Sequence, residues 1–133
     1  KMKFLNILLW IWQLPQHLLA LLIRIFTKSV RIQYFKHCTI YFLKNKRWGV
    51  SLGNNIFLGD IYLRVSDSYR LKTIQHEYGH SRQSQYLGLI YLLIIGLPSF
   101  LRATIWSLFK LESKKYYQGY PEKWADKLGN VQR

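Results

Sequence analysis

TIQHEYGHSRQSQYLG, residues 73–88, is the stretch that decides how the rest of the chain must fold. Two histidines stand four positions apart and a glutamate follows the first, giving His76, Glu77 and His80. On a helix, positions four apart lie one turn above each other, so both imidazoles can bind one ion. The spacing predicts a Zn²⁺ site on a helix over 68–87, with Glu77 pointing toward a catalytic water as a general base.

Two histidines leave a third ligand to find, and acidic residues are scarce. Besides Glu77, the glutamates are Glu112 and Glu122. Asp126 follows Glu122 by four residues, so on a helix over 120–128 both project from one face. A glutamate there can bind zinc while the aspartate hydrogen-bonds the distal ring nitrogen of a ligating histidine. Glu112 has no acid at that spacing, so Glu122 is the predicted third ligand.

HEYGH at 76–80, followed by EKWAD at 122–126, resembles the gluzincin branch of zinc metallopeptidases. The hallmark of that branch is HExxH plus a later glutamate with an acid four residues on. The resemblance implies His76, His80 and Glu122 as metal ligands, Glu77 as general base, and Asp126 as the residue that orients a histidine. The run over 76–99 is also similar to that of small, uncharacterised bacterial membrane-associated proteins.

The chain departs from the gluzincin pattern in two ways. Well-known gluzincins are several times longer and have a second domain that forms the substrate cleft, so an oligomer or a partner protein is expected to complete the cleft here. No residue is assigned to stabilise an oxyanion. Tyr116, Tyr117 and Tyr120 are the candidates for that role, by proximity alone.

Residues 47–67, RWGVSLGNNIFLGDIYLRVSD, precede the metal-binding helix and have the composition of strands and turns. Gly, Asn-Asn and Gly-Asp interrupt short runs of β-branched and aromatic residues, which predicts strands that include 56–58 and 61–65. Asp67 or Ser68 is expected to cap the helix, and Gly88 to end it. Residues 34–43 fit a strand or an amphipathic helix, and both readings stay open. We therefore expect one α+β domain over 1–133, mostly helical, with a small sheet or hairpin over about 47–66 and a minimal zincin-like core.

Composition favours a membrane-associated protein. Residues 4–23 and 83–101 contain no formal charge, and half of the chain is hydrophobic. The net charge of +14 favours anionic partners, and two apolar stretches favour an anionic membrane surface over nucleic acid. We expect a retained hydrophobic anchor over 4–26, either one helix or a bent pair of helices broken near Pro15.

Metal coordination constrains the topology of the second apolar stretch. A single crossing of the bilayer would separate Glu122 from His76 and His80, so residues 88–111 are expected to form a hydrophobic helical hairpin that turns at Gly96–Ser99. Seven Lys and Arg lie within 24–47, without an acid. This places the site near the cytoplasmic face, and the resemblance implies a bacterial inner membrane.

The leading hypothesis is a membrane-associated zinc metallopeptidase that acts on peptides or proteins. The first alternative is a non-catalytic membrane protein with a structural or vestigial zinc site, which a fourth ligand from His17 or His37 would favour. The second is a basic, membrane-tethered protein that binds nucleic acid or anionic lipid, although no specific nucleic acid is expected. Cys38 is the only cysteine, so a thiolate zinc cluster is excluded.

Overall fold

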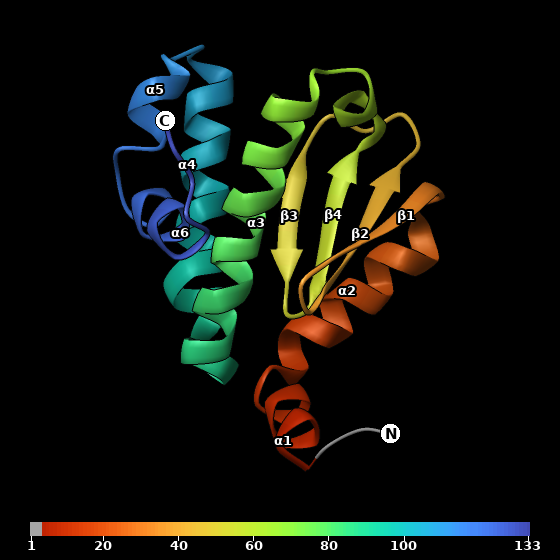
Figure 1. The fold of residues 1–133 in the computed structure, drawn as a ribbon. Coiled ribbons are helices and arrows are strands. Elements are labelled where there is room, and N and C mark those ends of the chain that lie inside the picture. Colours follow the sequence, from red (N-terminus) through yellow and green to blue (C-terminus); the bar gives the residue numbers. More distant parts are fainter. Residues whose placement is uncertain (1–3) are drawn as a thin grey trace.

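The computed structural model describes residues 4–133 and has an α+β fold (Figure 1). A four-stranded mixed sheet contains β1 (Ser29–Phe35), β2 (Cys38–Leu43), β3 (Gly49–Leu52) and β4 (Asn55–Gly59). The helices are α1 (Phe4–Trp12), α2 (Leu14–Phe26), α3 (Asp67–Leu87), α4 (Leu97–Leu108), α5 (Ser113–Tyr116) and α6 (Glu122–Leu128).

The sheet is covered by a helix on each face. Its strand order is β1-β2-β4-β3, with β2 and β4 parallel and the two outer pairs antiparallel. Ile40, Phe42, Ile56 and Leu58 pack with Ile74 and Tyr78 of α3 on one face, whereas Tyr41, Leu43 and Phe57 pack with Ala20 of α2 on the other. Because both faces are covered, every residue of β2 except Thr39 is buried.

The sheet is larger than expected and starts earlier. Residues 34–43, for which strand and helix were both open, belong to β1 and β2, which turn at Lys36 (φ +54°). A strand that is buried on both faces lacks the polar–apolar alternation that identifies a strand in a sequence. The predicted strand over 56–58 lies in β4, but the one over 61–65 is wrong, because Asp60–Leu63 forms a 3₁₀ helix.

Helix α3 begins and ends close to the predicted positions. Ser66, rather than Asp67 or Ser68, is the N-cap, and its hydroxyl accepts a hydrogen bond from the Tyr69 N–H at 3.3 Å. Gly88 ends the helix with φ +54°, as predicted. At α6, Pro121 and Gly129 flank the helix, which confirms the short helix expected over 120–128.

The predicted turn at Gly96–Ser99 is wrong. Gly96 is helical (φ −59°), and a π-helical segment, Leu92–Gly96, runs directly into α4. Pro98 is tolerated because it lies in the first turn of α4, where its missing N–H costs little. The chain instead reverses at the 3₁₀ turn Gly88–Ile90, so α3 and α4 run in opposite directions, and this reversal brings the chain back toward α6 (Figure 1).

Of the two alternatives for the N-terminal segment, one helix or a bent pair of helices, the structure has the bent pair. α1 and α2 meet at 78°, next to Pro15 in the first turn of α2. Together these two helices have the length and composition of a membrane span, and within residues 4–133 no single helix does. The polar residues at the bend pack against the end of α3: the Gln16 amide donates to Ser84 Oγ and to the Gly88 carbonyl, and Ser84 donates to Gln13.

Candidate metal centre

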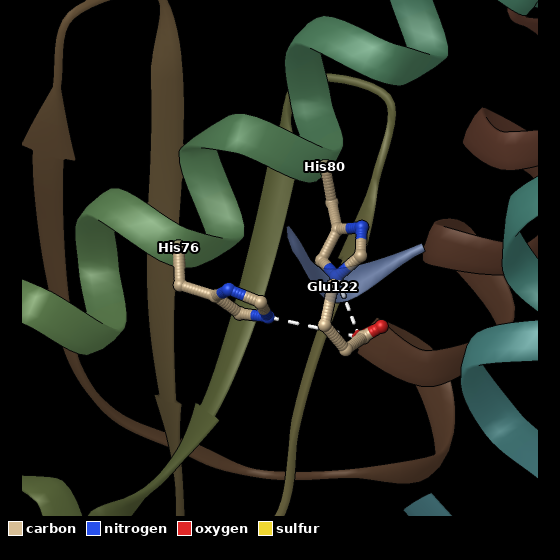
Figure 2. Close-up of side chains that lie close together, drawn as sticks. All are labelled: His76, His80 and Glu122. Atoms are coloured by element: carbon tan, nitrogen blue, oxygen red, sulfur yellow. Dashed lines mark hydrogen bonds and ion pairs between the residues drawn. The ribbon is translucent and has the colours of Figure 1, made fainter. Parts of the chain in front are cut away.

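His76 and His80 of α3 converge with Glu122 of α6 on one buried point (Figure 2). One potential ligand atom from each residue lies within 4.8 Å of the other two. Glu122 Oε1 is 3.1 Å from His80 Nε2 and 3.7 Å from His76 Nε2. In a tetrahedral zinc site with bonds of about 2.0–2.1 Å, ligand atoms are roughly 3.3 Å apart. The two distances to Glu122 therefore fit an ion at the centre of the group.

Two neighbouring side chains fix the orientation of the imidazoles. Asp126 Oδ1 is 2.7 Å from His76 Nδ1, and Gln83 Oε1 is 2.7 Å from His80 Nδ1. Both oxygens act as acceptors, so each histidine has its proton on Nδ1 and directs Nε2 toward Glu122. Asp126 is itself held by two hydrogen bonds from Arg133, at 2.8 and 2.9 Å. The ring orientation that a metal requires is thus present before a metal binds.

Glycines allow α3 and α6 to approach until their backbones touch. A Cβ atom on Gly79 would lie 1.8 Å from the Ala125 carbonyl oxygen, and one on Gly129 would lie 1.9 Å from the Gln75 carbonyl oxygen. Any larger residue at either position would push the helices apart. Gly79 lies between the two ligating histidines in sequence, so this contact sets the distance from α3 to Glu122.

Glu122 is fully buried and held by hydroxyl groups. Ser99 Oγ and Tyr116 OH donate to Oε1 at 2.8 and 3.0 Å, whereas the buried Oε2 has no hydrogen-bond partner. Burial opposes ionisation, but the adjacent imidazoles of His76 and His80 hold the pKa of Glu122 well below its ordinary value. A buried carboxylate with an unpaired oxygen beside two imidazoles is a donor set suited to a cation. The residues present therefore fit a zinc ion.

The charge of the site is opposite to that of the protein as a whole. The chain has six acidic residues against 20 basic ones, and three of the six, Glu77, Glu122 and Asp126, lie at this centre. Such clustering favours a cation at this point despite the net charge of +14.

Glu77 lies beside the metal group and faces a large cavity. The cavity holds about 720 Å³ and is lined by Glu77, His80 and Glu122, by all of β3, and by one face of α4. Burial raises the pKa of Glu77, while the imidazoles of His80 and His76 oppose that rise. A carboxylate with a raised pKa suits proton transfer near neutral pH.

Strand β3 forms one wall of the cavity and lies at the edge of the sheet. The Tyr91 hydroxyl donates to the Ser51 carbonyl at 3.2 Å, so Ser51 directs its backbone groups away from β4. Along a strand of an antiparallel ladder, the backbone N–H and C=O groups of every second residue point to the same side. Gly49 lies two residues before Ser51, so its backbone groups also point away from β4. A Cβ atom on Gly49 would lie 3.3 Å from Glu77 Oε1. The edge strand β3 therefore passes directly beside Glu77 at Gly49.

Of the three tyrosines considered for the oxyanion, Tyr116 is the one that lines the cavity. It also contacts Glu122, and burial raises the pKa of its phenol, which keeps the group a donor. Tyr117 instead packs edge-on against the His76 ring, and the Tyr120 hydroxyl donates to the Ile94 carbonyl.

The two histidines considered as a fourth ligand lie elsewhere. His37 Nε2 is 2.9 Å from Ser81 Oγ, and His17 stacks on Trp10. Within residues 4–133 the metal-ligand group comprises His76, His80 and Glu122.

Sequence reasoning missed two residues of the site, Gln83 and Ser99. Gln83 follows His80 by three residues, a helical spacing that would have identified it as a partner for the His80 ring. Ser99 comes from α4, and only the three-dimensional fold brings it to Glu122.

Comparisons of the chain with protein-family models, with curated proteins and with solved structures found no match. The function is therefore inferred from the geometry of the site.

Proposed function

We propose that the protein is a zinc-dependent metallopeptidase. The observation that carries this proposal is the convergence of His76, His80 and Glu122, with both imidazoles already held by hydrogen bonds at Nδ1 so that Nε2 faces Glu122. The three protein ligands leave a fourth position for water or substrate, as catalytic zinc sites do. When bound, a zinc ion would lower the pKa of a water and polarise a substrate carbonyl.

The residues of the chain supply the proton transfers. Glu77 accepts a proton from the water as its oxygen bonds to the carbonyl carbon, and delivers that proton to the leaving amine nitrogen as the C–N bond breaks. The buried position of Glu77 beside the metal group supports this role. The Tyr116 hydroxyl, 3.0 Å from Glu122 Oε1, is a donor that can turn toward a developing oxyanion.

A peptide is the preferred substrate because of strand β3. An extended peptide can pair with the free edge of a sheet through its backbone, whatever its side chains. Gly49 belongs to this edge strand and lines the wall of the cavity next to Glu77. A peptide bound there would run past the base and the metal group.

The test is zinc content measured together with peptide hydrolysis. Wild type, Glu77→Gln and Glu112→Gln are loaded with zinc and incubated with a peptide mixture made from a cell lysate, and cleavage is followed by mass spectrometry. We expect one zinc per chain in all three proteins and a loss of roughly 10²–10⁴-fold in rate for Glu77→Gln only. Glu112 is exposed, so its variant is the matched control. Zinc-loaded wild type that cleaves no faster than Glu77→Gln would refute the proposal.

A further inference from the structure

The cavity beside the metal group is an open, apolar groove. Besides Glu77 and Glu122, the only charged residue along it within residues 4–133 is Arg47, in a chain in which 20% of residues are charged. Trp48, Val50 and Leu52 line the groove from the β3 side, and Phe100, Ala103 and Leu108 line it from α4. Phe100 and Leu108 are 68% and 73% exposed, so the α4 wall is accessible to a substrate.

The apolar wall of the groove continues onto the outside of the molecule. Leu97, Leu101 and Ile105 are exposed, and their spacing of four places them on one face of α4. Leu108 follows Leu101 by seven residues, close to two helical turns, so the rim of the groove adjoins that outer face.

This outer face is part of a larger apolar surface. The Trp12 indole of α1 donates to the Gln85 carbonyl, and Gln16 of α2 donates to the Gly88 carbonyl, so the N-terminal helices adjoin the turn that leads to α4. Exposed apolar side chains cover these elements. We call this set the apolar surface: Phe4, Leu5, Ile7, Leu8, Ile11, Leu18, Leu19, Leu21, Leu22, Leu89, Ile90, Leu93, Ile94, Leu97, Leu101 and Ile105.

Charged residues border the apolar surface and are predominantly basic. Residues 4–23 and 83–101 carry no charge, and the first charged residues after them are Arg24 and Arg102. Lys28 lies beyond α2, and Lys110 lies beyond α4. An exposed apolar surface of this extent marks an interaction site, and a basic border matches the headgroups of an anionic bilayer.

We propose that the groove takes apolar peptide segments presented at the surface of a lipid bilayer that covers the apolar surface. This inference rests on the proposed peptidase activity and names its substrate class. A segment leaving the bilayer beside Leu101 would meet Leu108 and Phe100 at the mouth of the groove, and would then lie along β3 toward Glu77. An apolar segment suits this path because the groove offers few partners to charged side chains.

The first experiment tests substrate class. Sites cleaved in the lysate-derived peptide mixture are mapped by mass spectrometry for wild type, for Phe100→Ser/Leu108→Ser and for the control Phe109→Ser/Leu111→Ser. The control removes two exposed apolar residues that do not line the groove. We expect Leu, Ile, Val and Phe to be enriched at least threefold around the sites cut by wild type and control, and the enrichment to vanish in the groove variant.

The second experiment tests whether a lipid bilayer is the source of the apolar peptide segments. Protein is mixed with vesicles of phosphatidylcholine containing 30% phosphatidylglycerol, and vesicles are floated through a density gradient. We expect the protein to float with these vesicles and a Leu19→Ser/Leu22→Ser variant to float less. If the protein stays at the bottom of the gradient, the bilayer is not the source of the apolar peptide segments.

The outcomes separate this inference from the peptidase proposal. Cleavage without apolar enrichment, or enrichment that survives in the groove variant, overturns the substrate class and leaves the activity standing. Absence of cleavage above Glu77→Gln overturns both.

Discussion

Replacing Gly79 by alanine should displace the third metal ligand, Glu122, although Glu122 itself is unchanged. The added Cβ would lie 1.8 Å from the Ala125 carbonyl oxygen and 2.5 Å from the Ala125 carbonyl carbon. The neighbour is backbone, so no rotamer change relieves the overlap, and α6 must move by more than 1 Å. Metal–ligand distances tolerate only about 0.2 Å. Glu122 moves with α6, so zinc affinity should fall on the order of 100-fold or more.

The stability change should be smaller than the change in zinc affinity. Overpacking costs about 1–3 kcal/mol, and alanine in place of a mid-helix glycine returns about 1 kcal/mol. Metal-free Gly79→Ala should thus lose roughly 0–2 kcal/mol of unfolding free energy, measured by chemical denaturation.

Gly96→Ala is the matched control for Gly79→Ala. The nearest atom to its Cβ is the end of the flexible Leu92 side chain, at 3.3 Å. Competition with a zinc chelator gives the affinities of both variants. Unchanged affinity in Gly79→Ala would show that the contact between α3 and α6 does not place Glu122.

Three further predictions concern single groups of the molecule. Gln83→Leu should weaken zinc binding by about 10–100-fold, because His80 loses the hydrogen-bond acceptor at Nδ1. Gln85→Leu, on the same helix, should not weaken zinc binding. Equal zinc affinities of the two variants in a chelator titration would contradict this prediction. In the metal-free protein, burial opposes protonation of His76, but Asp126 and Glu122 raise its pKa to about 9. Zinc must displace that proton, so calorimetry at pH 7 in buffers of different protonation enthalpy should report release of about one proton for each zinc bound. Zinc affinity should fall about tenfold for each pH unit below 9. Zinc binding without proton release would refute this prediction. Burial raises the pKa of the Cys38 thiol to about 11, so iodoacetamide at pH 8 should modify it at least roughly 100-fold more slowly in the folded protein than in guanidinium. Equal rates would show that the thiol is exposed.

The sequence predicted the metal group well because its geometry is local. His76 and His80 share one turn of α3, and Glu122 and Asp126 share one face of α6, so helical spacing alone related the residues within each pair. We predicted that α3 and α6 lie together because few acidic residues were available as a third metal ligand.

The parts of the fold that were predicted wrongly depend on contacts between distant segments. β2 is buried by α2 on one face and by α3 on the other, so its sequence has no alternation to identify it. Gly96 and Pro98 predicted a turn, yet Gly96 ends a π-helical segment that runs directly into α4, which contains Pro98. Gly88 has the positive φ that reverses the chain. The bacterial inner membrane and the cytoplasmic position of the site stay predictions.

The most direct test of the account is the zinc X-ray absorption spectrum of the zinc-loaded protein. We expect one zinc per chain with two imidazole nitrogens, one carboxylate oxygen and one exchangeable water oxygen, at about 2.0–2.2 Å. The His80→Gln variant should lose one imidazole from the spectrum, and His37→Gln, which lies outside the site, should leave it unchanged. A spectrum with four protein ligands, or a protein that retains no stoichiometric zinc, would contradict the account.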